Sequence, residues 1–288
     1  MERELWPPLY RLLREVAKDF SQKYVQYQPW VLVAVALWAA LHDRPVSWAC
    51  QPRHWSTTTR RPLRLPSPST MSRRLDGVAV GLLLGALERR IREAGEPRLI
   101  ALMDGKPLPI GGNGKDPDAR FGRGAGCFAR GYKLHAVWSL RPMPEAWEVA
   151  PLNAHERGVA RAALLPQLGH GGYLLVDGNY DASDLFDAAW GRGYQMLMPL
   201  PAGKRPGGGK HYQSPQRLRS IALIRTDFGR ALYRERAGIE RYFGNAGSFG
   251  GGLGPPPAWV RGLPRVRTWV WAKLLINGVR IMRKHGLR

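Results

Sequence analysis

Two short apolar runs that each end in aspartate decide the fold of this chain: RLIALMD, residues 98–104, and GYLLVD, residues 172–177. Each has the length and composition of a buried strand, and each is followed directly by glycine. One such aspartate alone is more often a loop or helix-cap residue. Two in the same context favour a site, because strand ends of an open α/β sheet face the ligand crevice. We therefore expect Asp104 and Asp177 to be functional.

The segments around these two runs alternate between strand and helix patterns. The predicted strands cover 98–104, 127–140, 147–152, 172–177 and 194–199. The predicted helices that follow the first strand cover 156–168, 182–190, 226–245 and 264–284. Loops are expected at 111–126, which is Gly-rich and basic, and at 201–210, which is rich in Gly, Pro and Lys. Strands with helices inserted after the third indicate an α/β fold.

The first 96 residues carry helical patterns only. Two helices are expected within 1–48, separated near Gln26–Pro29, and an amphipathic helix over 77–94 ends at the Gly-Glu-Pro of 95–97. Between them, a short helix, a turn and an Arg-bearing helix capped by Ser69 or Thr70 form a helix-turn-helix type of pattern. Its first turns would bring Arg73 and Arg74 to a DNA groove. An ordinary capped helix with a basic face explains the same residues.

The chain is strongly basic, with 44 Lys and Arg against 22 Asp and Glu and a formal net charge of +22. A surplus of this size lies on the surface and indicates a polyanionic partner. Residues 201–288 hold +15 of it and residues 51–100 hold +6, whereas 151–200 is net negative. Basic flanks around an acidic centre favour an enzyme that holds nucleic acid and a cation. Chance clustering of Arg in a GC-rich genome is the alternative.

Hydropathy and cysteine content exclude several other classes. At 44% hydrophobic residues the chain is not disordered, and its longest apolar run, 30–41, is shorter than the roughly 20 residues of a membrane span. Cys50 and Cys127 each stand alone, which argues against a zinc module and against a disulfide scaffold. We expect a cytoplasmic, nucleoid-associated protein with no membrane partner.

The two aspartates also predict a chemistry. Paired carboxylates repel each other unless a cation intervenes, and hard oxygen ligands suit Mg²⁺. Two such ions about 4 Å apart activate an attacking oxygen and stabilise a leaving one in phosphodiester chemistry. A third carboxylate is expected from the helix YRERAGIERYF, residues 233–243, where Tyr233, Arg236 and Glu240 share one face. An exposed helix with an Arg–Glu pair at i,i+4 is the alternative for this segment.

Together these motifs resemble the DDE transposases of bacterial insertion sequences, in the group with a Tyr-x2-Arg-x3-Glu-x6-Lys signature. The matching stretches are 99–105, 174–181 and Tyr233, Arg236 and Glu240, and the likeness covers roughly 98–285. The resemblance implies an RNase H-like mixed sheet flanked by helices and following an all-helical region, in two domains, residues 1–96 for DNA binding and residues 97–288 for catalysis.

The resemblance also implies partners and site residues. Asp104, Asp177 and Glu240 would be catalytic and would hold Mg²⁺ or Mn²⁺, two ions in all. The partners would be double-stranded DNA, both element ends and target, with a dimer on the DNA. The candidate DNA contacts are Tyr233, Arg236, Lys106, Lys133, Asn179, Arg73 and Arg74.

One position departs from the signature, because Gly247 stands where its Lys falls. A basic tail that contains Arg261, Arg265, Arg267 and Lys273 is the candidate substitute for that DNA contact. The predicted function is metal-dependent cleavage of DNA at terminal inverted repeats and joining of the 3′-OH ends to target DNA. Two alternatives stay open, namely a catalytically degenerate or domesticated DNA-binding protein and an RNase H-like nuclease without strand transfer.

Overall fold

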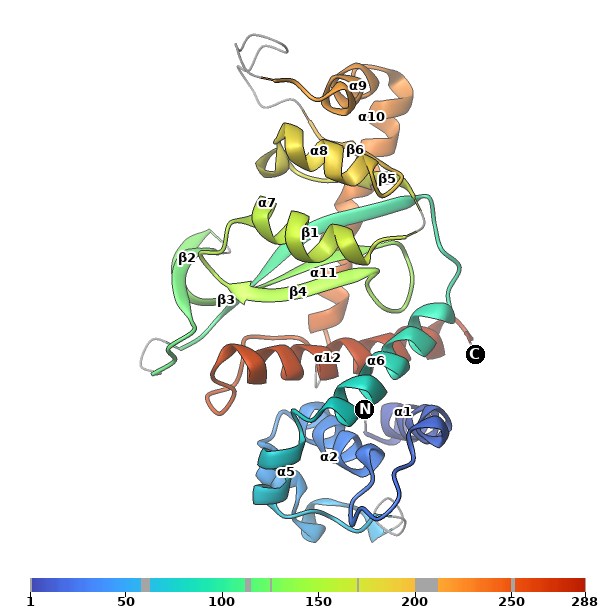
Figure 1. Cartoon of the computed structure of the whole chain (residues 1–288), viewed down its shortest axis with the longest axis vertical. Coiled ribbons are helices and arrows are strands. Elements are labelled where there is room, and N and C mark those ends of the chain that lie inside the picture. The colour runs from blue at the N-terminus through green and yellow to red at the C-terminus, as the bar shows by residue number, and fades with distance from the viewer. Residues whose placement is uncertain are drawn as a thin grey trace.

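A computed structural model describes residues 2–57, 63–111, 115–124, 126–169, 171–199, 212–249 and 252–287 of the chain. A mixed sheet with helices on both faces occupies its centre, and the N-terminal helices lie together below it (Figure 1). This confirms the predicted α/β, RNase H-like class with helices at the N-terminus. The loop predicted at 201–210 lies outside the described residues.

The sheet has six strands: five follow the order β2-β3-β1-β5-β6, and the sixth, β4, also pairs with β3. Their bounds are β1 Ile100–Pro109, β2 Arg120–Gly124, β3 Cys127–Trp138, β4 Ala146–Pro151, β5 Gly172–Leu175 and β6 Tyr194–Leu197. The pairs among β1 to β4 are antiparallel, whereas β5 is parallel to both β1 and β6. Strand β2 lies within the predicted 111–126 loop, which is therefore wrong over 120–124.

Strand β1 differs from its prediction in length. We expected it to end at Asp104, but it continues to Pro109. The reason is that β1 has two partners of unequal length. Its parallel pairing with β5 stops at Leu102, while its antiparallel pairing with β3 runs on from Leu102 to Pro109. Asp104 therefore lies within a strand, just past the point where the parallel neighbour ends.

The helices after β4 follow the predicted segments, with one addition. Residues 156–167 are helical throughout, first as an α-helix, then as π and 3-10 turns. The other helices are α8 Ser183–Trp190, α9 Pro215–Ile224, α10 Asp227–Arg234, the 3-10 turn η6 Glu235–Ala237, α11 Gly238–Gly247 and α12 Leu263–Lys284. Helix α9 was not predicted. Helix α7 is the first turn of the 156–167 segment, Glu156–Val159.

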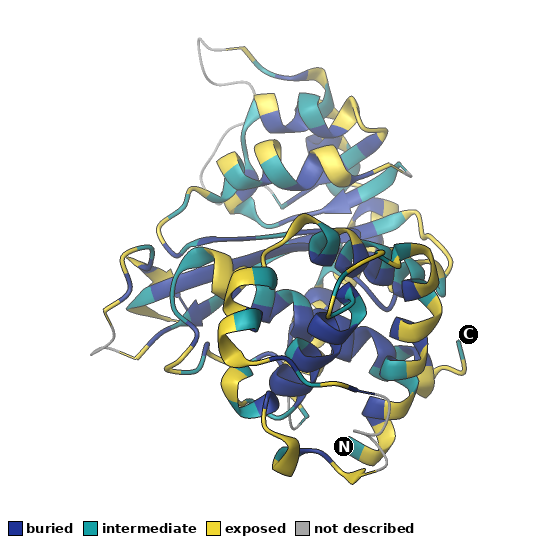
Figure 2. Cartoon of the chain, turned by 60° about the horizontal axis from the view of Figure 1, so that its bottom comes forward, coloured by how far each residue is buried: buried dark blue, intermediate teal, exposed yellow. Residues whose placement is uncertain are grey.

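The N-terminal helices pack around the C-terminal one. Their bounds are α1 Glu2–Val16, η1 Ala17–Phe20, α2 Pro29–Leu41, α3 Val46–Ala49, η2 Pro52–His54, α5 Pro68–Arg74 and α6 Val78–Glu93. Helix α12 contacts α1, α2 and α6 on one side and β4 on the other, so it lies between bundle and sheet (Figure 1). One apolar core runs through both parts, with exposed residues on the outer helix surfaces (Figure 2). The division at 96/97 stays a prediction.

The Arg-bearing helix begins two or three residues earlier than expected. Its N-cap is Ser67, whose Oγ accepts a hydrogen bond from Thr70 N, and Pro68 occupies the first helical position, for which its fixed φ is suited. The N-cap prediction at Ser69 or Thr70 is therefore wrong. Helices α3 and α5 contact each other, but residues 50–67 connect them. That connection is longer than the three- or four-residue turn of a helix-turn-helix.

Candidate active site

The topology of the sheet brings the two predicted aspartates together. The parallel ladder ends with Leu102 opposite Leu175. Asp104 lies two residues beyond Leu102, still in β1, and Asp177 lies two residues beyond Leu175, just past β5. Alternation along β1 places Asp104 on the face of Leu102, against which Gly238 of α11 packs. Both acids are thus presented to the segment that links α10 and α11.

A single arginine joins the two carboxylates. Nη2 of Arg236, in the turn η6, lies 3.1 Å from Oδ2 of Asp104 and 3.9 Å from Oδ2 of Asp177. The Arg236 side chain is 19% exposed and the two carboxylates are 26% and 30% exposed. These ion pairs are partly screened from water without being buried. A guanidinium cation therefore occupies the space between two carboxylates that face each other.

The surroundings raise the pKa of Asp104 above its usual range. Burial is the largest cause, and the negative charges of Asp177 and Glu156 act in the same direction. The hydrogen bond from Gly105 N, at 2.8 Å, and the charge of Arg236 oppose these effects without cancelling them. The charged form of Asp104 is therefore incompletely stabilised, and a positive charge placed beside it would be held firmly.

Asp177 is fixed in place by the residues around it. It is the N-cap of a short 3-10 turn, where its carboxylate accepts hydrogen bonds from Asn179 N at 2.9 Å and Asn179 Nδ2 at 3.2 Å. The hydroxyl of half-buried Tyr233 donates to Val176 O at 3.0 Å. Asn179 and Tyr233, both candidate DNA contacts, thus orient the strand end that carries Asp177, and their contact with DNA stays a prediction.

Glu240, the third predicted acid, is not gathered with the other two. It is exposed near the start of α11, and among the described residues no three His, Cys, Asp or Glu side chains lie close enough to hold a metal ion. The prediction assumed one continuous α-helix of about 100° per residue. The 3-10 turn η6 advances about 120° per residue, which rotates Glu240 relative to Tyr233 and Arg236.

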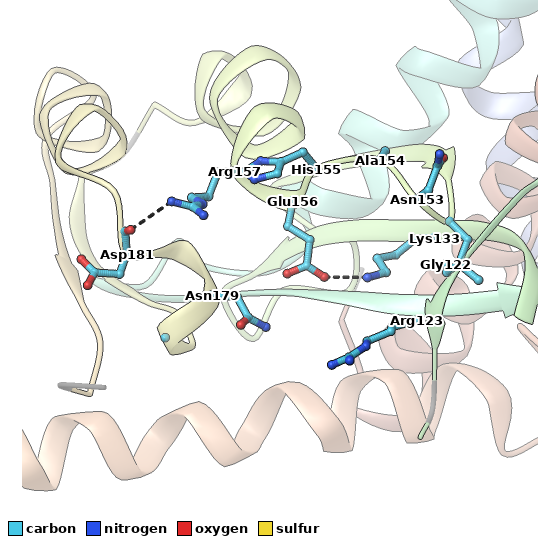
Figure 3. A pocket seen from close by; sticks show the side chains of 12 residues that line it. Gly122, Arg123, Lys133, Asn153, Ala154, His155, Glu156, Arg157, Asn179 and Asp181 are labelled. Atoms are coloured by element: carbon cyan, nitrogen blue, oxygen red, sulfur yellow. Dashed lines mark hydrogen bonds and ion pairs between the residues drawn. The ribbon is translucent and has the colours of Figure 1, made fainter. Parts of the chain in front are cut away.

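A different acid, Glu156, lies near the pair and was missed in the sequence. It begins α7, its charge contributes to the raised pKa of Asp104, and it accepts a hydrogen bond from Lys133 Nζ at 2.6 Å. Glu156 and Lys133 line a cavity of about 530 Å³ together with Asn179 and Arg123, as Figure 3 shows. The only signal for Glu156 in the sequence was its place in the net-negative segment 151–200.

The predicted basic contacts have three different environments. Lys106 lies two residues after Asp104 on the same face of β1, and burial lowers its pKa. Lys133 is buried in its ion pair with Glu156. Arg73 is exposed and Arg74 half-buried on α5, which lies among the N-terminal helices. All four DNA contacts stay predictions.

The structure explains the glycine in place of the signature lysine. A Cβ atom at Gly247 would lie 3.0 Å from the carbonyl oxygen of Leu253, so a side chain there needs the backbone to shift. Of the proposed substitutes, Lys273 is wrong, because it is fully buried and donates to Ala40 O and Asp43 Oδ1, each at 2.6 Å. Its role is to join α12 to the N-terminal helices.

Arg236 already marks a cation position between Asp104 and Asp177, so these two residues fit a divalent ion by charge and by donor type. They would supply two of its oxygen ligands. The third carboxylate would have to come from elsewhere, with Glu240 and Glu156 as the candidates. When bound, such an ion supplies Lewis acidity for phosphodiester chemistry.

Comparison with known proteins identifies the family of the chain. Residues 95–253 match the family model described as "Transposase DDE domain", a stretch that contains Asp104, Asp177, Arg236 and Glu240. No curated protein and no solved structure matches the chain. Among the described residues, none of the helices is both long and apolar enough to cross a membrane. The match spans more than half of the chain, which therefore belongs to the DDE transposase family.

Proposed function

We propose that this chain is a DNA transposase that cleaves phosphodiester bonds at the terminal inverted repeats of its element and joins the freed 3′-OH ends to target DNA. Two copies would act together, one on each end. The observation that carries this proposal is the convergence of Asp104 and Asp177 on the Arg236 guanidinium, within the stretch that matches the family.

The residues of the candidate site would have different roles in this reaction. Asp104 and Asp177 would hold Mg²⁺ or Mn²⁺, with Glu240 or Glu156 completing the ligand set. Arg236 neutralises the two acids in the absence of metal. With a divalent ion bound, the guanidinium would be available to contact a DNA phosphate, for which its planar donor fork is suited. Lys106, on the same face of β1 as Asp104, would bind the next phosphate.

The direct test is cleavage of DNA that carries the terminal repeats, measured with and without Mg²⁺. In Asp104→Asn and Asp177→Asn, cleavage should fall on the order of a thousandfold or more, because transition-state charge is no longer stabilised. Binding of the same DNA should persist. Asp184→Asn is the matched control, since Asp184 is an exposed acid on α8 that pairs with Arg161. Cleavage that survives in Asp177→Asn would refute the assignment.

Two further variants identify the third acid. Glu240→Gln should abolish cleavage if α11 supplies the ligand when DNA binds, and Glu156→Gln should do so if α7 supplies it. The assay also separates the alternative functions. Binding without cleavage in the wild type indicates a degenerate copy, and cleavage without joining indicates a nuclease.

A further inference from the structure

The hairpin of β2 and β3 displays two phenylalanines that the fold does not use. Phe121 is 60% exposed and Phe128 is 71% exposed. They lie across the two strands with ring centroids 5.9 Å apart and ring planes 7° from parallel. The hairpin projects from the edge of the sheet in Figure 1. Most of the area of both rings is therefore open to solvent, which is costly for an apolar side chain without a partner.

The opposite face of the hairpin is fixed to the protein. Gly122 is buried against the backbone of Leu152, whose oxygen would lie 2.6 Å from a Cβ atom at that position. Leu152 N also donates to Gly131 O at 3.0 Å. The phenylalanines therefore occupy the free face of an anchored ribbon, and they are held there rather than exposed by disorder.

In the segment of residues 115–131 the acidic and the basic side chains point in different directions. Its two acids turn inward: Asp116 accepts a hydrogen bond from Gly262 N and Asp118 accepts one from Leu263 N. Its exposed charged residues are all basic, namely Lys115, Arg120 and Arg123. An aromatic pair among positive charges with no outward acid is complementary to a polyanion that carries flat, stackable groups. Nucleic acid combines both properties.

The hairpin also borders the active site. Arg123 lines the 530 Å³ cavity together with Asn179, which is hydrogen-bonded to Asp177. Figure 3 shows the Arg123 side chain extending toward Asn179. A strand that lies in this cavity would pass from Asn179, beside Asp177, to Arg123 on the hairpin.

We propose that Phe121 and Phe128 form a platform on which unpaired bases of the DNA strand stack, while Arg120 and Arg123 bind its phosphates. Residues 115–131 contain no Asn, Gln, Ser or Thr, the neutral side chains that read base edges. Recognition is therefore by ring faces, which every base has, and is tolerant of sequence. This inference rests on the proposed function, because it takes DNA as the substrate.

The test compares the full-length wild type with Phe121→Ala/Phe128→Ala, by fluorescence anisotropy, on a single-stranded oligonucleotide and on its fully paired duplex. Single-strand affinity should fall about tenfold, whereas duplex affinity stays within about twofold, because paired bases cannot reach the rings. The double Trp variant should restore single-strand affinity. Phe228→Ala is the matched control, since Phe228 is 58% exposed on α10, beside the other edge of the sheet.

A salt series separates the two parts of the platform. The Phe variant should keep the wild-type dependence of log Kd on log salt, and Arg120→Ala/Arg123→Ala should reduce that slope by about 0.7 for each lost phosphate contact. Unchanged single-strand affinity in the Phe variant, or an equal loss on single strand and duplex, would overturn the platform. The platform would also be overturned if the Phe variant kept its DNA affinity but lost self-association, as measured by sedimentation. A wild type that binds neither DNA would instead refute the proposed function itself.

Discussion

Asp104 and Asp116 are close together in the chain, yet the fold surrounds them in opposite ways. Asp116 is 1% exposed, and its carboxylate accepts hydrogen bonds from Asp118 N, Ala119 N, Gly262 N and Tyr132 Oη, at 3.1, 3.3, 3.0 and 2.7 Å. Within the part of the chain that the structure describes, Asp104 accepts a single backbone hydrogen bond, from Gly105 N, and shares one arginine with a second acid.

The pKa values of the two acids move in opposite directions. Burial alone would raise the pKa of Asp116, but the hydrogen bonds from Gly262, Tyr132, Asp118 and Ala119 together lower it. At Asp104 the effect of burial is larger than the opposing effects of Gly105 N and Arg236, so its pKa is raised. A carboxylate whose oxygens are fully supplied with donors stabilises the fold. A carboxylate that has few hydrogen-bond donors and lies beside a second negative charge is available to bind a cation. Substitutions at the two positions test that distinction.

The largest effect on stability is expected at Asp116. In Asp116→Ala the free energy of unfolding should fall by about 3 kcal/mol, because several buried donors lose their acceptor and the 115–119 segment loses one of its hydrogen bonds to the start of α12. Asp104→Asn should be neutral or stabilising, because it removes repulsion from Asp177. Urea denaturation measures both. Equal destabilisation by the two variants would erase the distinction.

Low pH should remove the stabilisation that Asp116 contributes. A carboxyl whose pKa is lower in the folded state stabilises the protein fully above its unfolded pKa of about 4, and that stabilisation disappears as the pH falls through the folded value. The stability difference between wild type and Asp116→Ala should therefore be constant above about pH 5 and shrink below about pH 4. A difference that instead grows in acid would contradict the lowered pKa.

A substitution at Arg236 tests whether Asp104 and Asp177 are available to a cation. In Arg236→Gln the two acids lose their cation, so added Mg²⁺ or Mn²⁺ should raise Tm more than in the wild type, by about 2–4 °C for about 1 kcal/mol of extra stabilisation. Asp104→Asn/Arg236→Gln is the control and should lose this extra response. An identical metal response in wild type and Arg236→Gln would mean that the guanidinium does not occupy the cation position.

The smallest effect is expected at His135, a buried polar side chain whose surroundings disfavour its charged form. It is fully buried on β3, burial lowers its pKa to about 4, and neither ring nitrogen has a hydrogen-bond partner among the described residues. His135→Leu should leave the free energy of unfolding unchanged or raise it by up to about 1 kcal/mol. Reduced DNA cleavage at unchanged stability would show that His135 serves the site.

Most elements of the fold followed from local patterns. Helices α2, α6 and α12 and strands β3 to β6 formed close to their predicted segments, since apolar spacing is a property of the neighbouring residues themselves. Boundaries that depend on a partner were less predictable. Strand β1 runs past Asp104 because β3, far along the chain, continues to pair with it, and no local pattern marks that extension.

The candidate site divides in the same way. Asp104 and Asp177 were found from their strand-then-Asp-Gly context, and both lie at the site. Glu240 was assigned from helical phase, which the three-residue 3-10 turn η6 changes, and its role as a ligand stays a prediction. Lys273 looked like one more surface cation on a basic helix, but α12 turns it into the junction with the N-terminal helices.

The sequence by itself determined the family, the α/β class and the two strand-borne aspartates, because these depend on residue order, apolar spacing and acids that packing does not require. Only the tertiary structure decided that both aspartates converge on one guanidinium, 132 residues from Asp104 in the chain. It also decided which acids near β2 turn inward and which aromatic rings stay exposed. Local periodicity fixes the backbone within a few residues, whereas the partner of each charge depends on how distant elements pack.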